Sequence, residues 1–232
     1  MATPQPIYFR QVEAGPMANY VYLIGDPKTR VAAIVDPAWE VQRLVDLAQA
    51  DGYELRHILL THYHPDHLGG DFMGTHIDGA VEVLGRVKAK LYAHKAEVPW
   101  VRRLAGLASS DVVAVESGDT ASLGELNLTF IHTPGHTPGS QCFMIDRKLI
   151  SGDTLFIGGC GRVDLPGADP AQMYHSLNHI LRNLADDTVV YPGHAYAPQP
   201  SSTIGEEKRA NPYMRFDSLA QFLAAMGVPR AQ

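Results

Sequence analysis

The sequence predicts a mixed α/β fold in which two β-sheets pack face to face and helices cover their outer surfaces. Two observations indicate this arrangement. Short apolar stretches recur in both halves of the chain, and each half also contains segments with apolar residues at helical spacing. At 232 residues the chain can bury a substantial core. We expect one domain over residues 1–232, with the C-terminal helices of residues 201–227 as part of it.

The first half of the chain is expected to be rich in short strands. Apolar stretches bounded by turn residues predict strands over residues 7–12, 18–24, 31–35, 58–60 and 91–93. A helix that ends at Gly52 is expected to follow the third strand. Its apolar face consists of Val41, Leu44, Val45 and Ala48. Two further helices are predicted, over residues 77–84 and over residues 95–107 with an interruption near Pro99.

The second half repeats this scheme. Strands are predicted over residues 112–115, 126–131, 141–145, 148–150 and 188–191. Asp169 is expected to cap a helix, with Pro170 in the first turn and Gln172 completing a capping box. The core face of this helix would consist of Met173, Leu177, Ile180, Leu181 and Leu184. Thr203 and Glu206 form a second capping-box pattern, and residues 215–226 predict a closing helix.

Composition excludes several classes of partner. The net charge is −6 and the 19 Lys and Arg residues are scattered, which argues against a nucleic-acid surface or an anionic membrane. No apolar run approaches the length of a bilayer span. The N-terminus has no basic region followed by an apolar stretch, so we expect a cytoplasmic protein. The oligomeric state stays open, a homodimer included.

The segment after the strand at residues 58–60 is the most informative part of the chain. It places His62, His64, Asp66 and His67 within six positions. Imidazole nitrogens and carboxylate oxygens suit zinc, iron and manganese. In an extended stretch, His62 and His64 point to the same side and can reach one ion. Asp66 and His67 lie beyond the turn and would more naturally serve a second ion.

Three further turns each carry one residue of a metal-ligating type. They contain His136, Asp153 and His194, and each follows an apolar run that predicts a strand. Loops at strand ends are where functional sites are usually built. The total of five histidines and two aspartates is enough for two ions that share one carboxylate.

These motifs, in this order, resemble the metallo-β-lactamase superfamily, and within it the glyoxalase II and persulfide dioxygenase branch. The resemblance covers nearly the whole chain and implies an αββα sandwich. It also implies a division of the ligands between two metals: His62, His64 and His136 for the first, Asp66, His67 and His194 for the second, and Asp153 as the bridge. A hydroxide between two divalent ions, zinc first and iron or manganese as alternatives, would be the nucleophile of a hydrolase. Asp66 would also orient that hydroxide.

The substrate implied by the resemblance is a small thiol ester, as in glyoxalase II, which cleaves acylated glutathione. Only 38 residues follow His194, so the long C-terminal region that supplies glutathione contacts in that enzyme is largely missing. Persulfide dioxygenases are the main alternative. They use one iron, held by the equivalents of His62, His136 and Asp153, to oxidise glutathione persulfide. Lactone or β-lactam hydrolysis on the same site is a further alternative, and a non-catalytic metal-binding module is a third.

Several residues near the motifs are candidates for substrate contacts. Arg162 could bind a carboxylate through its planar guanidinium, although an ion pair with Asp164 explains it equally well. The other candidates are Cys160, Tyr63, Tyr196 and Lys208. Asp36, at a strand end, is a candidate for fixing the tautomer of a ligating imidazole.

The remaining titratable residues are assigned mainly structural roles. Cys142 falls in a predicted strand and is expected to be a reduced core residue, because two cysteines cannot make a disulfide framework. The histidines expected to be structural or solvated are His57, His132, His175 and His179. The roles of His76 and His94 stay open.

Overall fold

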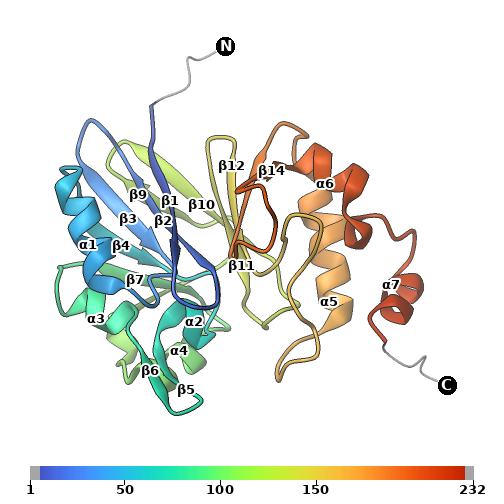
Figure 1. Cartoon of the computed structure of the whole chain (residues 1–232), viewed down its shortest axis with the longest axis horizontal. Helices are drawn as coiled ribbons and strands as arrows, with labels where there is room; N and C mark the ends of the chain where they lie inside the picture. Colours follow the sequence, from blue (N-terminus) through green and yellow to red (C-terminus); the bar gives the residue numbers. More distant parts are fainter. Residues whose placement is uncertain (1–5, 228–232) are drawn as a thin grey trace.

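The computed structural model describes residues 6–227 and consists mainly of two six-stranded sheets, with helices on the outside of each (Figure 1). The first sheet has the order β1-β2-β3-β4-β7-β8. Its strands are β1 (Tyr8–Ala14), β2 (Asn19–Gly25), β3 (Val31–Val35), β4 (Glu54–Leu59), β7 (Lys90–His94) and β8 (Val112–Val115). The N-terminal residues 1–5, on which the expected absence of a secretory signal depends, lie outside the described range.

The second sheet has the order β14-β13-β12-β11-β10-β9. Its strands are β9 (Thr120–Leu123), β10 (Leu126–His132), β11 (Gln141–Ile145), β12 (Lys148–Gly152), β13 (Val189–Pro192) and β14 (Ser202–Thr203). Each predicted strand has a counterpart, and those over 31–35, 112–115 and 141–145 have the predicted bounds. The short strands β9 and β14 were not predicted, because neither contains a continuous apolar run of the kind on which the other strand predictions rest.

Helices cover both sheets. Beside the first sheet lie α1 (Val41–Ala50), α2 (Pro65–Leu68), α3 (Ala80–Leu84) and α4 (Val98–Ala105), with the 3-10 turn η1 (Ser109–Asp111) before β8. The second sheet is covered by α5 (Pro170–His175), the π-helical turn η2 (Ser176–Ile180), η3 (Leu181–Asn183), α6 (Ile204–Ala210), η4 (Pro212–Met214) and α7 (Leu219–Ala225). Among these, no helix is both long and apolar enough to span a bilayer.

Three helix predictions need correction. The helix predicted over residues 77–84 is shorter than expected. β5 (Gly70–Phe72) and β6 (Thr75–Ile77) form a hairpin, and α3 starts only at Ala80. The reason is the close approach of two turns, since a Cβ on Gly79 would lie 2.4 Å from the Cα of Gly69. Pro99 does not interrupt a helix but sits in the first turn of α4. The closing helix is shorter than predicted, because Ser218 caps α7.

The capping predictions for α5 and α6 hold in most respects. The Asp169 carboxylate accepts the backbone N–H groups of Ala171 and Gln172. The Gln172 side chain donates to that same carboxylate, and not to a backbone group as a capping box requires. Thr203 and Glu206 form the complete capping box that the sequence predicts.

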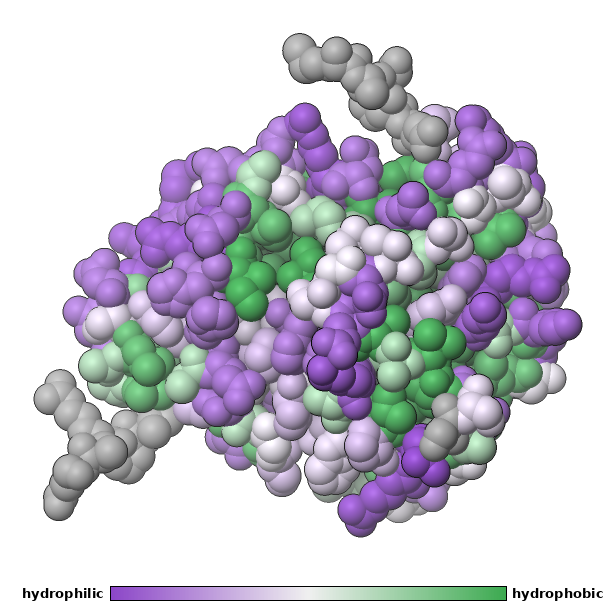
Figure 2. Space-filling view, turned by 180° about the vertical axis from the view of Figure 1, so that it is seen from behind, coloured by the Kyte–Doolittle hydropathy of each residue, from purple (hydrophilic) through white to green (hydrophobic). Residues whose placement is uncertain are grey.

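The interior is divided into three apolar layers. The apolar face predicted for α1, Val41 with Leu44, Val45 and Ala48, is buried against the outer face of the first sheet. Between the sheets lies a second layer, and a third separates the second sheet from α5 and its neighbours. Cys142 is fully buried in this third layer, as predicted, whereas Ile180 and Leu184 are only partly buried. The surface in Figure 2 is largely hydrophilic, with separate hydrophobic areas.

Phe130 tests the layer between the sheets. Its ring is fully buried and contacts Tyr92 of the first sheet and Phe143 of the second, at centroid distances of 5.9 and 5.5 Å. We expect Phe130→Ala to lower the free energy of unfolding by about 3–5 kcal/mol, because the lost ring leaves a cavity. Phe72→Ala, at a residue with 39% exposure, should change it by less than about 0.5 kcal/mol. Denaturant unfolding measures both, and equal losses would contradict the assignment of Phe130 to the core.

Candidate metal centre

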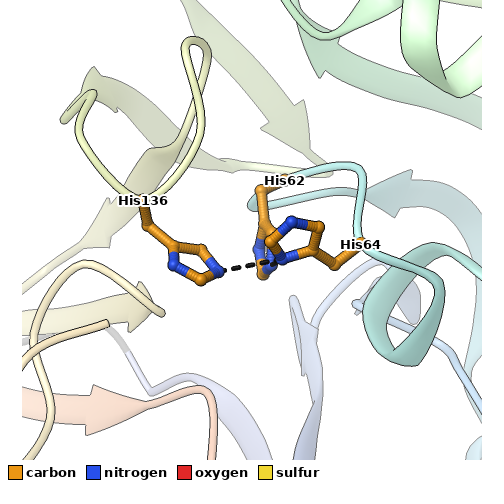
Figure 3. Close-up of side chains that lie close together, drawn as sticks. All are labelled: His62, His64 and His136. Atoms are coloured by element: carbon orange, nitrogen blue, oxygen red, sulfur yellow. Dashed lines mark hydrogen bonds between the residues drawn. The ribbon is translucent and has the colours of Figure 1, made fainter. Parts of the chain in front are cut away.

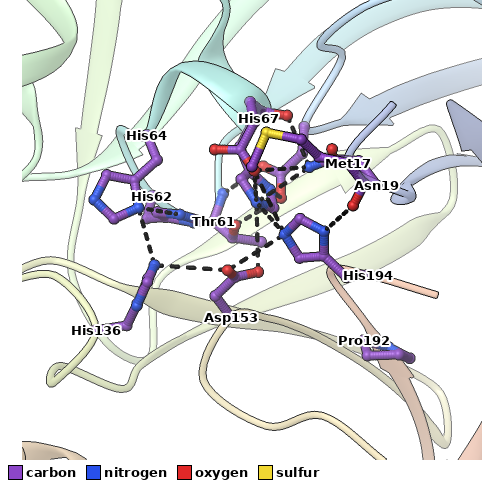
Figure 4. Close-up of polar contacts among 12 residues, drawn as sticks. Met17, Asn19, Thr61, His62, His64, His67, His136, Asp153, Pro192 and His194 are labelled. Atoms are coloured by element: carbon purple, nitrogen blue, oxygen red, sulfur yellow. Dashed lines mark hydrogen bonds and ion pairs between the residues drawn. The ribbon is translucent and has the colours of Figure 1, made fainter. Parts of the chain in front are cut away.

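Loops from both sheets bring the candidate ligands together (Figure 4). The histidine-rich segment leads from β4 into α2, and His136 lies in the loop between β10 and β11. Asp153 directly follows β12, and His194 lies just after β13. Because β3 runs parallel to β4 and β12 runs parallel to β13, several of these loops follow the carboxyl ends of neighbouring strands.

The first group of ligands consists of three histidines whose rings converge (Figure 3). His64 Nδ1 lies 3.1 Å from His62 Nε2 and 2.9 Å from His136 Nε2. His62 and His136 are almost completely buried, and His64 is partly exposed. Burial lowers the pKa of His62 far below its ordinary value and that of His64 to about 4, with the neighbouring histidines adding to the effect. Both imidazoles are therefore neutral near pH 7, as metal ligation requires.

The second group consists of Asp66, His67 and His194. His67 Nε2 lies 3.2 Å from His194 Nε2 and 3.4 Å from Asp66 Oδ2. The distance from His194 Nε2 to Asp66 Oδ2 is 3.5 Å. Burial would raise the pKa of Asp66, but the adjacent His67 and His194 and the Asn19 amide lower it well below its ordinary value.

Asp153 lies between the two groups. Its Oδ2 is 3.6 Å from His136 Nε2 and 3.4 Å from His194 Nε2, while Oδ1 is 3.4 Å from His67 Nε2. Burial opposes ionisation of this carboxyl, but His67 and His194 outweigh it and lower the pKa of Asp153 to about 2. Asp153 Oδ1 is also buried without a hydrogen-bond partner among the described residues. An unpartnered carboxylate oxygen beside histidine nitrogens suits a shared cation.

The protein fixes the tautomer of four of the five imidazoles. The Nδ1 atoms of His136 and His194 contact the backbone carbonyls of Arg162 and Met17 at 2.8 and 2.9 Å, and carbonyls can only accept. His67 Nδ1 donates to Asp36 Oδ2 at 3.0 Å. His62 Nδ1 donates to Thr61 Oγ1, whose own proton goes to Asp36. Because Nδ1 is the donor in each ring, Nε2 is the nitrogen directed at the site and available to a metal. Burial opposes protonation of His67, but Asp66, Asp153 and Asp36 outweigh it and raise its pKa well above the ordinary value, so a metal at this position would displace a proton from Nε2.

Asp36 is the acceptor that links both groups, as the sequence hypothesis for this residue anticipated. It is 3% exposed and accepts from the Thr61 N–H at 2.8 Å, the Thr61 hydroxyl at 2.6 Å and His67. Thr61 in turn holds His62. One carboxylate therefore orients a histidine of each group.

Asn19 is a residue of the candidate site that could not be found from the sequence. Its side-chain amide donates to the backbone oxygen of Asp66 at 2.9 Å and to Asp66 Oδ2 at 3.1 Å. Trp39 Nε1 donates to Asn19 Oδ1 at 3.0 Å and so fixes the orientation of the amide. A single asparagine 47 positions before its partner carries no recognisable motif.

The five substrate-contact candidates lie in different surroundings. Tyr196 is 62% exposed and stacks on the His194 ring at 4.6 Å. Arg162 pairs with Asp164 at the surface, while its backbone carbonyl contacts His136.

The other three candidates are more enclosed. Tyr63 is buried, donates to the Pro166 carbonyl and stacks on Trp100. Cys160 is partly buried, which raises the pKa of its thiol to about 12. The Lys208 ammonium contacts Leu184 O and Asp186.

The other histidines lie outside the two groups. His76 is exposed between Asp71 and Glu82. His94 and His132 stack on each other with ring centroids 3.8 Å apart, and burial lowers the pKa of His94 to about 4. His57 is partly buried against Tyr92, and His175 and His179 are exposed. None of these six belongs to the converging groups around Asp153.

Comparison with known proteins points to the same family as the fold and the seven candidate ligands do. The family model described as "Metallo-beta-lactamase superfamily" matches residues 14–194, a range that includes all seven candidate ligands. The chain belongs to the metallo-beta-lactamase superfamily. The fold class predicted from the sequence is thereby confirmed, and the protein is an enzyme of this superfamily.

Members of the superfamily with two different activities resemble this chain. The hydroxyacylglutathione hydrolase of Synechococcus sp. (strain JA-3-3Ab) is 32% identical over 237 residues, covering 87% of this chain and 86% of the relative. The mitochondrial persulfide dioxygenase ETHE1 of Homo sapiens is 30% identical over 226 residues, covering 96% and 81%. The crystal structure of ETHE1 from Myxococcus xanthus superposes with a TM-score of 0.82 at 32% identity, covering 96% of this chain and 92% of that one.

Substitution of Asp36 tests the orienting role described above. We expect Asp36→Asn to weaken metal binding by about 10–100-fold, because an amide N–H₂ would replace an oxygen to which Thr61 and His67 donate. Chelator competition measures the affinity. Asp51→Asn is the control, since Asp51 also accepts side-chain hydrogen bonds but from Tyr8 and Arg10 at the surface. Equal affinities for the two variants would contradict this role of Asp36.

Proposed function

We propose that this protein is a binuclear metal-dependent hydrolase that cleaves a thioester of the hydroxyacylglutathione type. The observation that supports it most is the pair of ligand groups that share Asp153. In this proposal His62, His64 and His136 hold the first ion, and Asp66, His67 and His194 hold the second. Asp153 bridges them. Zinc is the proposed metal, because nitrogen-rich sets with carboxylates suit it.

The donor set fits such ions. Four Nε2 atoms point inward because each Nδ1–H donates to a fixed acceptor, and Asp153 Oδ1 has no other partner among the described residues. When bound, divalent ions supply a nucleophilic water at neutral pH and stabilise the charge that develops on the substrate carbonyl.

Asp66 is the side chain that we propose to act in catalysis beside the metal ions. Its side chain is 13% exposed, whereas that of His67 is fully buried, so Asp66 reaches the open side of the site. The Asn19 amide holds one carboxylate oxygen. The low pKa of Asp66 keeps it ionised, so it can accept a hydrogen bond from the attacking water and orient it.

Two exposed side chains near the site support recognition of a thiol carrier. The Tyr196 ring lies against His194 and borders Phe156, at centroid distances of 4.6 and 5.4 Å. The Arg162 guanidinium is exposed and directed at a carboxylate, that of Asp164. We propose that a carboxylate of the thiol carrier can take the place of Asp164, since both oxygens of one carboxylate fit the guanidinium fork.

The alternative is a one-iron persulfide dioxygenase that uses His62, His136 and Asp153. The similarity to ETHE1 favours it. What favours the hydrolase is the second group: His194 has its tautomer fixed by Met17 and its Nε2 directed at Asp66 and Asp153, an arrangement that a single iron does not require.

Metal content and His194→Ala together separate the two activities. The hydrolase predicts two ions per chain in protein purified without added metal or chelator, measured by mass spectrometry. It also predicts cleavage of S-lactoylglutathione that falls on the order of 100-fold or more in His194→Ala, because the second ion is lost. One iron per chain, with persulfide-dependent O₂ uptake retained in His194→Ala, would establish the dioxygenase. The hydrolase proposal fails if metal-replete protein leaves thioesters, lactones and β-lactams all untouched.

Arg162 has its own test. We expect Arg162→Ala to raise KM for a carboxylate-bearing thioester about tenfold, with kcat changed less than about threefold, because the contact binds the ground and transition states alike. Asp164→Asn is the matched control: it releases the guanidinium and should leave KM equal or lower. If both substitutions raise KM equally, Arg162 and Asp164 form a structural pair instead.

A further inference from the structure

Glu97 is a buried carboxylate with no part in the ligand groups described above. It immediately precedes α4 and is 1% exposed. Its Oε2 accepts the backbone N–H of Tyr63 at 2.7 Å. Its Oε1 accepts the backbone N–H of Gly139 at 2.7 Å and the Thr137 hydroxyl at 3.0 Å. The carboxylate therefore has three donors, and each of its oxygens contacts a different loop.

Both loops carry ligands of the first group. Tyr63 stands between His62 and His64, and its backbone N–H is directed at Glu97 while those two rings face the site. Thr137 and Gly139 follow His136 closely in the chain. The first loop belongs to one sheet and the second to the other, so Glu97 connects the two sheets where the three histidines meet.

The loop that contains Gly139 packs closely against Glu97. A Cβ on Gly139 would lie 2.6 Å from Glu97 Cγ and 2.9 Å from its backbone nitrogen, so only glycine allows the loop to approach. Burial of the carboxyl also has a cost, since it raises the pKa of Glu97 to about 7 in spite of the three donors. An apolar residue could fill this volume without that cost, but it could not hold two loops by their N–H groups.

We propose that Glu97 is a positioning residue of the first metal site, whose carboxylate sets the distance between the loop of His62 and His64 and the loop of His136. The inference rests on the proposed metal centre. Glu97 would act on the first ion and not on the second. Its side-chain hydrogen bonds reach residues next to the first group and none next to His194 or Asp153.

Glu97→Gln is the informative substitution. Glutamine has the same shape, but its amide N–H₂ would face the Tyr63 N–H, or else the donors of Thr137 and Gly139. A buried N–H directed at another donor loses its hydrogen bond and forces one loop to shift. We expect the first site to weaken tenfold or more and the second site to change less than twofold.

Variants that keep only one of the two metal sites make that difference in affinity measurable. In a His194→Ala background the first site alone is complete, and in a His136→Ala background the second site alone is complete. Zinc affinity is measured by chelator competition in each background, with and without Glu97→Gln. A second readout is the visible spectrum of cobalt in the His194→Ala background, which reports a change in the geometry of the first site. Neither readout needs catalytic activity.

Asp26→Asn is a matched control. Asp26 is 2% exposed and, like Glu97, accepts two backbone N–H groups and one threonine hydroxyl. It connects the turn after β2 with Glu125, which lies in the turn between β9 and β10 of the other sheet. This contact is at the opposite end of β3 from Asp36. A general loss of stability should appear in both variants, whereas a shift at the first metal site should appear only in Glu97→Gln.

Gly139→Ala provides an independent test that keeps the carboxylate and serves if Glu97→Gln does not fold. The added methyl group would push the loop away from Glu97, so the first site should weaken selectively here as well. Unchanged first-site affinity in the variants that fold, or equal weakening of both sites, would overturn the inference. Absence of zinc binding in both single-site backgrounds would instead refute the metal centre of the proposed function.

Discussion

The hydrogen bonds accepted by Asp36 are the contacts on which the geometry of the site depends most. This carboxylate stands at the end of β3 in a left-handed backbone conformation, with φ of +49°, and receives three donors from the segment that follows β4. Through Thr61 it orients His62, and directly it orients His67. The parallel pairing of β3 with β4 places donor and acceptor side by side. A regular feature of the sheet thus determines two imidazole tautomers.

Other hydrogen bonds that hold the loops of the candidate ligands come from segments distant in the sequence. Glu207 and Asn211, both buried, hold the turn after Asp153 through Gly158 N–H and the carbonyls of Phe156 and Gly159. That turn continues to Arg162, whose carbonyl fixes His136. The C-terminal segment that contains Glu207 and Asn211 therefore supports the candidate ligands indirectly, through the backbone of the turn that leads to Arg162.

The sequence allowed prediction of what depends on local pattern and not of what depends on long-range contact. Strand ends followed by His or Asp identified all seven candidate ligands, and the apolar periodicity of Val41, Leu44, Val45 and Ala48 predicted the buried face of α1. Asn19 and Glu97 could not be found in this way, because each acts on a residue 34 or more positions away. The β5–β6 hairpin was missed because the contact of Gly69 with Gly79 is tertiary.

The division of ligands between the sheets has a thermodynamic consequence. His62, His64, Asp66 and His67 come from the first sheet, whereas His136, Asp153 and His194 come from the second. In the proposed centre each ion has ligands from both, so each ion would cross-link the two halves of the sandwich. Since the unfolded chain has no preformed site, the binding free energy adds to the free energy of unfolding. Free metal at 1,000 times its Kd would stabilise the fold by about 4 kcal/mol. That is a large part of the stability of an ordinary domain, so metal supply would influence the amount of folded protein as well as its activity.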